Sequence, residues 1–410
     1  MARLCGLPPT LVDLSMTTTP EVAARQAQVD SPPSRASPVT PLPTRLASLT
    51  SLRFFAAFAV FTHHFNGISA GGGVWHVPMI FPYSKIGVHG VTFFFVLSGF
   101  LLTWSHKPGA AKKVFYWRRV GRIYPAHFVA AGLALLVFYG MGTDRTDLFS
   151  VVTSLLLVQT WFPHVVPNLP GNPVTWTLSV ELLFYALFPL CIGRLRRMRT
   201  RGLALLTFAG LAGMWAVNCF ADHYLNHHDA FWVMRHPIVY LPQFLIGVTF
   251  AIALRRGHRV PLRPFAAVLL ILAYTVVYTR ADDWAGKFVA HQMETTVRPV
   301  VAILSVLLIA ACVQNEAAGR SRLLTKRYLI LLGASSYAFY LVHQTVNQFI
   351  RLYWRGHPDS NEAIVYLLGV FLISQALAWL LYRYVEEPAQ VWWSKRGPKS
   401  RPRPAVTTAA

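Results

Sequence analysis

The amino-acid sequence predicts an all-α protein that crosses a membrane about ten times and carries one further short apolar segment. Only 13% of its 410 residues are charged and 54% are hydrophobic, whereas soluble domains usually have about a quarter charged residues. Apolar runs recur along the chain at lengths near the ~20 residues that a spanning helix needs. The basic residues gather in short clusters between these runs, which is typical of cytoplasmic loops. These observations predict a polytopic membrane protein.

Eleven apolar segments follow one another along the chain. The fourth is about 13 residues long, which is too short for a full crossing and favours a re-entrant or surface segment. The other ten are predicted to cross the bilayer. The segments are 47–67, 87–104, 123–141, 148–160, 173–192, 202–221, 238–254, 263–280, 297–313, 328–350 and 361–383.

The positions of the basic clusters support this count. If segment 148–160 also crossed, the clusters that begin at Lys107 and at Arg194 would face opposite sides. If it does not cross, every basic cluster faces one side, and the other side receives loops that are poor in Lys and Arg. The positive-inside rule therefore predicts a cell-membrane protein with both termini in the cytoplasm.

The ends of the chain differ in composition from the apolar region. Residues 1–45 are rich in Pro, Thr, Ser and Ala and lack periodicity, so they are predicted to form a disordered cytoplasmic tail. Residues 391–410 are predicted to form a second, basic and disordered cytoplasmic tail. Residues 46–390 then form one transmembrane domain, whose first segment is expected to anchor the chain in place of a cleavable signal peptide.

Composition also argues against several partners. The net charge of +22 does not predict nucleic-acid binding, because the basic residues lie between membrane segments. The four cysteines form no CxxC pair, so neither a disulfide framework nor a zinc site is expected. The stretch His223–Asp229 could ligate a metal through its histidines and aspartate, but a loop cluster without a fourth ligand is weak evidence, and no metal site is predicted.

Ionisable residues within apolar segments are functional candidates, because each costs about 2.5–3.5 kcal/mol on insertion scales. Arg53 and His64 are eleven residues apart, which places them on one helix face about 16 Å apart along the axis. Arg53 is then near the inner surface and His64 in the outer half, while His63 points about 100° away. The alternatives are an interfacial anchor for Arg53 and a helix-packing role for His64.

Two later segments carry ionisable groups at the depth predicted for His64. Glu181 lies about two turns into its segment from the outer side, and a carboxylate there needs a partner, for which His64 is suited by depth. Tyr340 and His343 share a helix face, and His343 also reaches the outer half. We therefore expect His64, Glu181 and His343 at one depth; a structural pair of Glu181 with an arginine or histidine is the alternative.

Three further motifs have alternative interpretations. Arg119 and Arg122 are spaced i, i+3 and can reach one phosphate-bearing ligand together, although an ordinary cytoplasmic anchor is the other explanation. Ser98-Gly99 is expected to serve helix packing, because the G-x-S-x-G context of a nucleophilic serine is absent. Val385–Pro388 predicts the end of the last helix, and a surface cap is the alternative.

Taken in order, these motifs resemble those of the membrane-bound acyltransferase family 3, whose members O-acylate sugars, polysaccharides and macrolides. The resemblance covers about residues 45–390. It implies an acyl-CoA donor on the cytoplasmic side and an acceptor at or beyond the outer face. The motifs are Arg53-x10-His64, FFFVLSGF (Phe93–Phe100), the RxxR of Arg119 and Arg122 followed by IYP, WTLSVE (Trp176–Glu181) with Ser179 and Glu181, SYAFYLVH (Ser336–His343), and VEEP (Val385–Pro388).

The resulting hypothesis is a membrane O-acyltransferase that moves an acyl group, most simply acetyl, from acyl-CoA to a hydroxyl of a carbohydrate or of a glycosylated or macrolide acceptor in the cell envelope. No bound cofactor is expected, since acyl-CoA is a substrate. The main alternative is a transporter or exporter whose ionisable residues line a substrate or proton path; the absence of an apparent internal repeat argues against it.

Each candidate residue receives a role in this hypothesis. His64 is the general base or, alternatively, an acyl carrier. Glu181 orients His64 or neutralises its charge. His343 and Tyr340 hold the carbonyl oxygen or the acceptor. The assignments are His64, Glu181, His343 and Tyr340 for catalysis, and Arg53, Arg119 and Arg122 for the donor.

Overall fold

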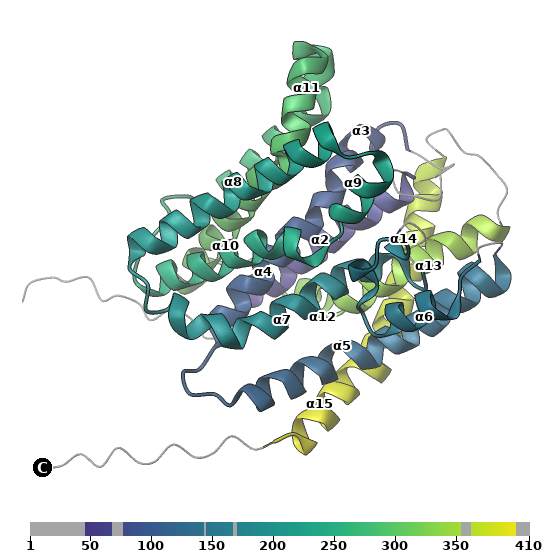
Figure 1. The fold of residues 1–410 in the computed structure, drawn as a ribbon, viewed down its shortest axis with the longest axis horizontal. Coiled ribbons are helices and arrows are strands. Elements are labelled where there is room, and N and C mark those ends of the chain that lie inside the picture. Colours follow the sequence, from purple (N-terminus) through teal and green to yellow (C-terminus); the bar gives the residue numbers. More distant parts are fainter. Residues whose placement is uncertain (1–45, 68–76, 143–144, 167–169, 354–361, 399–410) are drawn as a thin grey trace, which may run out of the picture. The chain divides into compact units, whose positions relative to one another are not determined.

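The computed structural model describes residues 46–67, 77–142, 145–166, 170–353 and 362–398, and all regular structure in these ranges is helical. This confirms the predicted all-α class (Figure 1). The predicted tail at 1–45 lies outside the described residues. The long helices are α2 (Ala47–Phe65), α4 (Gly90–Ser105), α5 (Lys112–Leu135), α7 (Trp176–Leu195), α8 (Thr200–Tyr224), α10 (Pro237–Arg255), α11 (Pro264–Ala317), α13 (Ser336–Tyr353) and α14 (Ala363–Leu381).

Shorter elements connect the long helices or extend them. Several continue a neighbouring helix, as η1 does before α4 and η2 after α5. They are α3 (Phe81–Ser84), η1 (Lys85–His89), η2 (Leu136–Met141), α6 (Leu148–Leu155), η3 (Gln159–Trp161), η5 (Pro173–Thr175), α9 (His227–Val233), α12 (Arg327–Ala334), η6 (Tyr382–Glu386) and α15 (Glu387–Arg396).

The chain is a multi-pass membrane protein. Seven helices of the described ranges are long and apolar enough to span a bilayer, or eight if α12 and α13, which meet at a 60° bend, form one span. This number is below the predicted ten for two reasons. One is that α2 is not among the seven, because its polar residues, including Arg53, His63 and His64, lower its hydropathy. The other is that α11 contains two of the predicted segments.

The two halves of α11 run back along each other. Val260, just before the helix, and Gln314, near its end, exchange two hydrogen bonds: Val260 N to Gln314 Oε1 (3.1 Å) and Gln314 Nε2 to Val260 O (3.0 Å). A straight helix of 54 residues would separate these ends by about 80 Å. The reversal lies at Gly286, whose φ of 81° is available to glycine at little steric cost.

The short fourth segment matches its prediction. The helix α6 has eight residues, which gives a length of about 12 Å, far below a bilayer's hydrocarbon thickness. Its N-cap is Asp147, whose carboxylate accepts hydrogen bonds from Ser150 N (2.9 Å) and Ser150 Oγ (2.6 Å). These bonds favour the ionised form and hold the pKa of Asp147 below its usual value.

The prediction that Val385–Pro388 ends the last helix is wrong. A π-helical turn, η6, leads directly into α15, and Pro388 lies in the first turn of α15, where its missing N–H is not needed. The Trp393 carbonyl in α15 accepts a hydrogen bond from Trp117 Nε1 of α5 (2.8 Å). The predicted tail at 391–410 is therefore helical up to Arg396, and residues 399–410 lie outside the described ranges.

Glycines allow helix backbones to touch. A Cβ on Gly99 of α4 would lie 2.0 Å from the Phe244 carbonyl oxygen of α10, and a Cβ on Gly247 of α10 would lie 1.9 Å from the Val96 oxygen of α4. The two helices thus pack backbone to backbone in the manner typical of membrane helices. This supports the packing role predicted for Ser98-Gly99.

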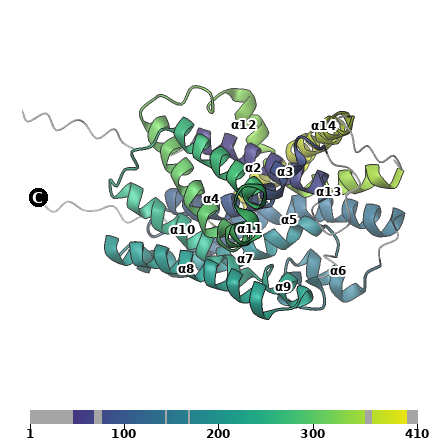
Figure 2. The ribbon, with the colours of Figure 1, turned by 90° about the horizontal axis from the view of Figure 1, so that it is seen from above.

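The helix α2 is packed against α4, α11, α12, α13 and α14, and Figure 1 and Figure 2 show it among these helices. Two glycines bring neighbouring backbones onto it: a Cβ on Gly87 would lie 2.2 Å from the Ala59 oxygen, and one on Gly333 would lie 1.9 Å from the Thr50 oxygen. No side chain other than hydrogen fits at these two contacts.

Both ends of α2 are capped by other helices. At its start, the Glu316 carboxylate of α11 accepts hydrogen bonds from the backbone N–H groups of Ala47 (2.9 Å) and Ser48 (3.0 Å). At its end, Asn347 of α13 donates to the His64 carbonyl (3.2 Å) and Arg351 donates to the Phe65 carbonyl (3.2 Å). Each cap satisfies backbone groups that a helix terminus leaves unpaired and complements the helix dipole.

The glycine contact between α4 and α10 can be tested by adding one methyl group. Gly99→Ala is expected to destabilise the protein by about 1–3 kcal/mol, because the methyl would meet backbone that cannot rotate away. Gly132→Ala is the matched control, since nothing lies within 4 Å of a Cβ there and alanine is the better helix former by up to about 1 kcal/mol. Thermal unfolding in detergent measures both; equal midpoints would contradict the contact.

Candidate active site

A cavity of about 510 Å³ lies among α2, α4, α5, α7 and α13. Arg53 of α2, Arg119 and Arg122 of α5, and Glu181 of α7 all contribute to its wall. The other lining residues are mostly apolar or aromatic, as in pockets that bury a ligand with a polar and an apolar part. The structure therefore brings together the three arginines that the sequence assigned to the donor.

The arginine side chains are held by aromatic and charged neighbours. The Arg119 guanidinium lies over the rings of Phe115 and Tyr185, with 5.4 and 5.2 Å between Cζ and the ring centroids. Its Nε is buried and has no hydrogen-bond partner among the described residues. Arg53 and Arg122 lie close enough to interact electrostatically with each other and with nearby carboxylates.

Glu386 is a second carboxylate of this group, and the sequence analysis missed it. It is only 3% exposed and interacts electrostatically with Arg53 and Arg122. Gln390 donates to its Oε1 (3.1 Å), while Oε2 has no partner among the described residues. The neighbouring Glu387 forms an ion pair with Arg383 instead, with 2.8 Å between Oε2 and Nη1. The signal in the sequence is the VEEP motif, which belongs to the family resemblance but predicts a helix end and no role for Glu386.

Three guanidinium groups and two carboxylates meet here, so the group has an excess of one positive charge when all are ionised. Guanidinium groups bind phosphate oxygens through charge-assisted, often paired hydrogen bonds. The arrangement is thus suited to a ligand that carries phosphate groups.

Glu181 does not pair with His64 as predicted. It accepts hydrogen bonds from the hydroxyl of Tyr185, one turn further along α7, and from Ser98 Oγ (3.3 Å). One turn in the other direction, Thr177 donates to the Tyr340 hydroxyl (3.2 Å), which fixes the register of α7 against α13. Along the helix axis, Glu181 therefore lies about 6 Å from the contact between Thr177 and Tyr340. His343 lies about 4.5 Å from the same contact in the opposite direction. Depth counted along separate helices was too coarse to show this.

His64 pairs with His343. The distance from His64 Nδ1 to His343 Nε2 is 2.8 Å, and His343 Nδ1 is 2.8 Å from the Tyr340 carbonyl oxygen. A carbonyl can only accept, so His343 Nδ1 carries the hydrogen, and its Nε2 in the neutral ring accepts from His64 Nδ1–H. The lone pair of neutral His64 is then on Nε2. This chain of two hydrogen bonds prepares His64 Nε2 to accept a proton.

His63 has a different environment. It is buried, and its Nδ1 is 3.1 Å from the Ser84 carbonyl oxygen, while His64 is half-buried. A ring with a packed, carbonyl-bonded position of this kind stabilises the fold. The structure thus supports the preference for His64 that helical phase predicted. Ser179 also faces away from the cavity, since its Oγ is 2.6 Å from Thr160 Oγ1.

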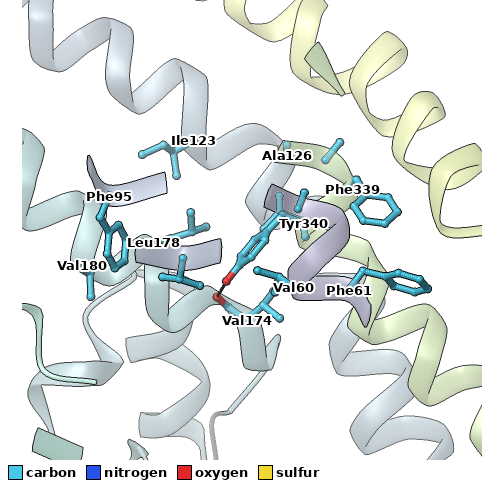
Figure 3. Packing of buried hydrophobic residues seen from close by; sticks show 14 of the residues in the cluster. Val60, Phe61, Phe95, Ile123, Ala126, Val174, Leu178, Val180, Phe339 and Tyr340 are labelled. Carbon is cyan, nitrogen blue, oxygen red and sulfur yellow. Dashed lines mark hydrogen bonds between the residues drawn. The ribbon is translucent and has the colours of Figure 1, made fainter. Parts of the chain in front are cut away.

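Tyr340 lies between the cavity and the histidine pair. It contributes to the cavity wall, and its ring centroid is 5.6 Å from that of His343. Figure 3 shows its hydroxyl directed at the Val174 carbonyl, to which it donates over 3.4 Å. The hydroxyl is therefore bonded to the first turns of α7, and its predicted contact with a substrate oxygen stays a prediction.

The stretch His223–Asp229 has structural contacts of its own. Asn226 caps α9 by accepting from Asp229 N (2.9 Å), and its amide donates to Asp229 Oδ2 (2.8 Å). In the part of the chain that the structure describes, no group of three or more His, Cys, Asp or Glu residues is placed to hold a metal ion.

Comparison with known proteins identifies the family. The model of acyltransferase family 3, described as an acyltransferase domain, matches residues 46–383. The acyltransferase MdmB of Streptomyces mycarofaciens is 28% identical over 90% of this chain and 98% of its own length. Nodulation protein 10 of Rhizobium leguminosarum bv. viciae is 30% identical over 82% of this chain and 91% of its own length. The peptidoglycan O-acetyltransferase OatA of Listeria monocytogenes is 24% identical over 83% of this chain and 55% of its own length.

No solved structure matches the chain. The chain belongs to the acyltransferase family 3 and is a membrane O-acyltransferase. Its reaction therefore takes an acyl donor and an acceptor, and this assignment replaces the alternative of a transporter or exporter.

The hydrogen-bond chain at His64 predicts specific tautomers. Nitrogen NMR of histidine-labelled protein is expected to show hydrogen on Nδ1 in both His64 and His343. His343→Ala removes the acceptor of His64 Nδ1–H, so His64 should shift toward the Nε2–H form, while His63, bonded to Ser84, should be unchanged. Hydrogen on Nε2 of neutral His64 in the unsubstituted protein would refute the chain.

Proposed function

We propose that this acyltransferase moves an acyl group, with acetyl as the first candidate, from cytoplasmic acyl-CoA to a hydroxyl of a carbohydrate or of a glycosylated or macrolide acceptor. The observation that carries the proposal is that α2 has the arginine-lined cavity at its Arg53 end and a proton-accepting histidine at its His64 end. Acetyl is favoured by the name of the O-acetyltransferase relative. A macrolide or glycan acceptor rests on the resemblance to the family.

The cavity suits acyl-CoA in charge and in polarity. Its arginines would bind the CoA phosphates. The apolar part of the cavity wall, which includes Phe94 and Leu178, would contact the thioester arm and the acyl group. The basic clusters that flank the apolar segments support a cytoplasmic position for Arg119 and Arg122, with both termini on the same side.

The acyl transfer itself needs one proton acceptor. His64 Nε2 takes the proton of the acceptor hydroxyl while that oxygen attacks the thioester carbonyl. A carbon–oxygen bond forms, the carbon–sulfur bond breaks, and the proton passes from the imidazolium to sulfur, so that CoA leaves as the thiol. His343 keeps His64 in the tautomer that can act as base, with the Tyr340 carbonyl as the end of the chain.

The role proposed for Glu181 follows its contacts. It is bonded to Tyr185 and Ser98 beside the arginines, so it positions Arg119 and Arg122 by charge rather than orienting His64. With Glu386 it limits the repulsion among three guanidinium groups, which would otherwise spread apart. The cavity then holds the arginines in place before the donor arrives.

The two adjacent histidines offer a matched test of the base. His64→Asn is expected to lower the rate of transfer from radiolabelled acetyl-CoA by about 10²–10⁴-fold, the usual contribution of a general base. His63→Asn keeps a donor for the Ser84 carbonyl and should retain most of the activity. Both are assayed at equal abundance in membranes of a deletion strain. Full activity of His64→Asn would exclude the base assignment.

The donor assignment is tested by removing phosphate from the donor. Arg122→Gln is expected to raise the KM for acetyl-CoA by roughly 10- to 100-fold, since hydrogen bonds to charged groups contribute about 1.5–3 kcal/mol. S-acetylpantetheine, which lacks the nucleotide, should show no such difference between the two enzymes. Arg118→Gln, an exposed neighbour on the same helix, is the control. An equal effect on both donors would contradict phosphate binding.

A further inference from the structure

Three arginines gather at the His64 end of α2, away from the donor cavity; we call them the second basic cluster. They are Arg235, between α9 and α10, Arg298 of α11, and Arg351 of α13. Arg351 donates through Nη2 to the His64 carbonyl (3.4 Å). Arg298 contacts the sulfur of Met234, the residue before Arg235, through Nη1 (3.7 Å). Arg235 is also close enough to His64 to interact with it electrostatically. The proposed chemistry at His64 has no role for any of them.

We propose that the second basic cluster binds an anionic group, a carboxylate or a phosphate, of the acyl acceptor. The acceptor is then an acidic molecule that places one hydroxyl at His64 Nε2. This inference rests on the proposed function, since it takes His64 as the site where the acceptor reacts.

The guanidinium groups are held in place without being neutralised. Arg235 lies over the Phe231 ring, with 3.4 Å between Cζ and the centroid, and donates through Nη1 to the Phe231 carbonyl (3.2 Å). Arg298 donates through Nη2 to the Tyr240 hydroxyl (3.1 Å) and contacts the Met234 sulfur through Nη1 (3.7 Å). All of these partners are uncharged.

Donor capacity remains on each side chain. Arginine has five N–H groups. The Nε atoms of Arg235 and Arg351 are buried and have no hydrogen-bond partner among the described residues. A buried, unmade hydrogen bond costs about 1–3 kcal/mol. A bound oxyanion would satisfy these groups.

The charge of the cluster is also uncompensated. Within the residues that the structure describes, none of the three arginines has a hydrogen bond or ion pair to Asp or Glu; the ion pairs involve Arg280, Arg383, His228 and His291 instead. Unpaired charges in or near the bilayer are costly. In the proposed orientation they also lie on the outer side, where arginine is disfavoured.

Helix capping explains only one member of the cluster. Arg351 donates to the last carbonyls of α2, and a cation at a helix C-terminus is favourable. Arg235 and Arg298 do not contact α2 in this way; their bonds are to Phe231, Tyr240 and Met234. A ligand accounts for all three, and guanidinium groups are suited to the paired oxygens of carboxylates and phosphates.

The donor does not account for the cluster. In the proposed function the CoA phosphates lie with Arg53, about 16 Å along α2 from His64. An acceptor anion beside His64 would also offset the repulsion between the two arginines and the imidazolium that forms during transfer. The cluster would therefore both position the acceptor and favour the charged form of the base.

The charge of the acylated product tests the inference. Membranes of the source organism receive radiolabelled acetyl-CoA, and the label that depends on this enzyme is applied to an anion-exchange column at neutral pH. We expect the labelled product to be retained on the column. Treatment with phosphatase or mild acid should abolish this retention if the anion is a phosphate, and amidation of carboxylates should abolish it if the anion is a carboxylate. A neutral or cationic labelled product would overturn the inference alone, whereas donor hydrolysis without any labelled ester would overturn the proposed function.

Variants then test whether the cluster itself recognises this charge. With acceptor extracted from the deletion strain, Arg235→Gln and Arg298→Gln are expected to raise the KM for acceptor roughly 10- to 100-fold and leave the KM for acetyl-CoA unchanged. Arg235→Lys should recover part of the loss. Arg280→Gln is the control, because Arg280 is a half-exposed arginine of α11 that is bonded to Asp283. Equal changes in both KM values, or no recovery by lysine, would mean that the cluster is structural.

Discussion

Capping of α2 by other helices is the interaction on which both parts of the site depend. The Glu316 carboxylate holds the first N–H groups of α2, and Asn347 and Arg351 hold its last carbonyls. A helix with an arginine near one end and two histidines near the other is a poor membrane segment by composition. Its position is fixed by these polar caps and by the close packing of its backbone.

Close packing explains why the site can be rigid inside a bilayer. Lipid tails are as apolar as leucine, so helices associate through van der Waals contact and hydrogen bonds rather than through hydrophobic burial. Gly87 and Gly333 bring two backbones against α2, and Gly99 and Gly247 join α4 to α10. These contacts leave little freedom for the cavity walls that carry Arg53 of α2 and Ser98 of α4.

The sequence predicted relations within one helix well and relations between helices poorly. Helical phase correctly separated His64 from His63, and the spacing of Tyr340 and His343 correctly placed them together. The partner of Glu181 was wrong, because depth along two separate helices does not give their lateral positions. Glu386 was missed because a π turn continues the helix where proline suggested its end. The reversal within α11 depends on the positive φ of one residue, Gly286. Composition does not reveal such a backbone conformation.

The cavity and the histidine pair lie along one helix, and this has a thermodynamic consequence. In the proposed reaction, the CoA phosphates stay at the Arg53 end, and the thioester arm carries the acyl group to His64, about half the thickness of the hydrocarbon layer away. Neither the nucleotide nor the acceptor has to be transported. The free energy of thioester cleavage would then drive a vectorial step, so the modification of an external molecule would need no ion gradient, no flippase for the donor and no second energy source.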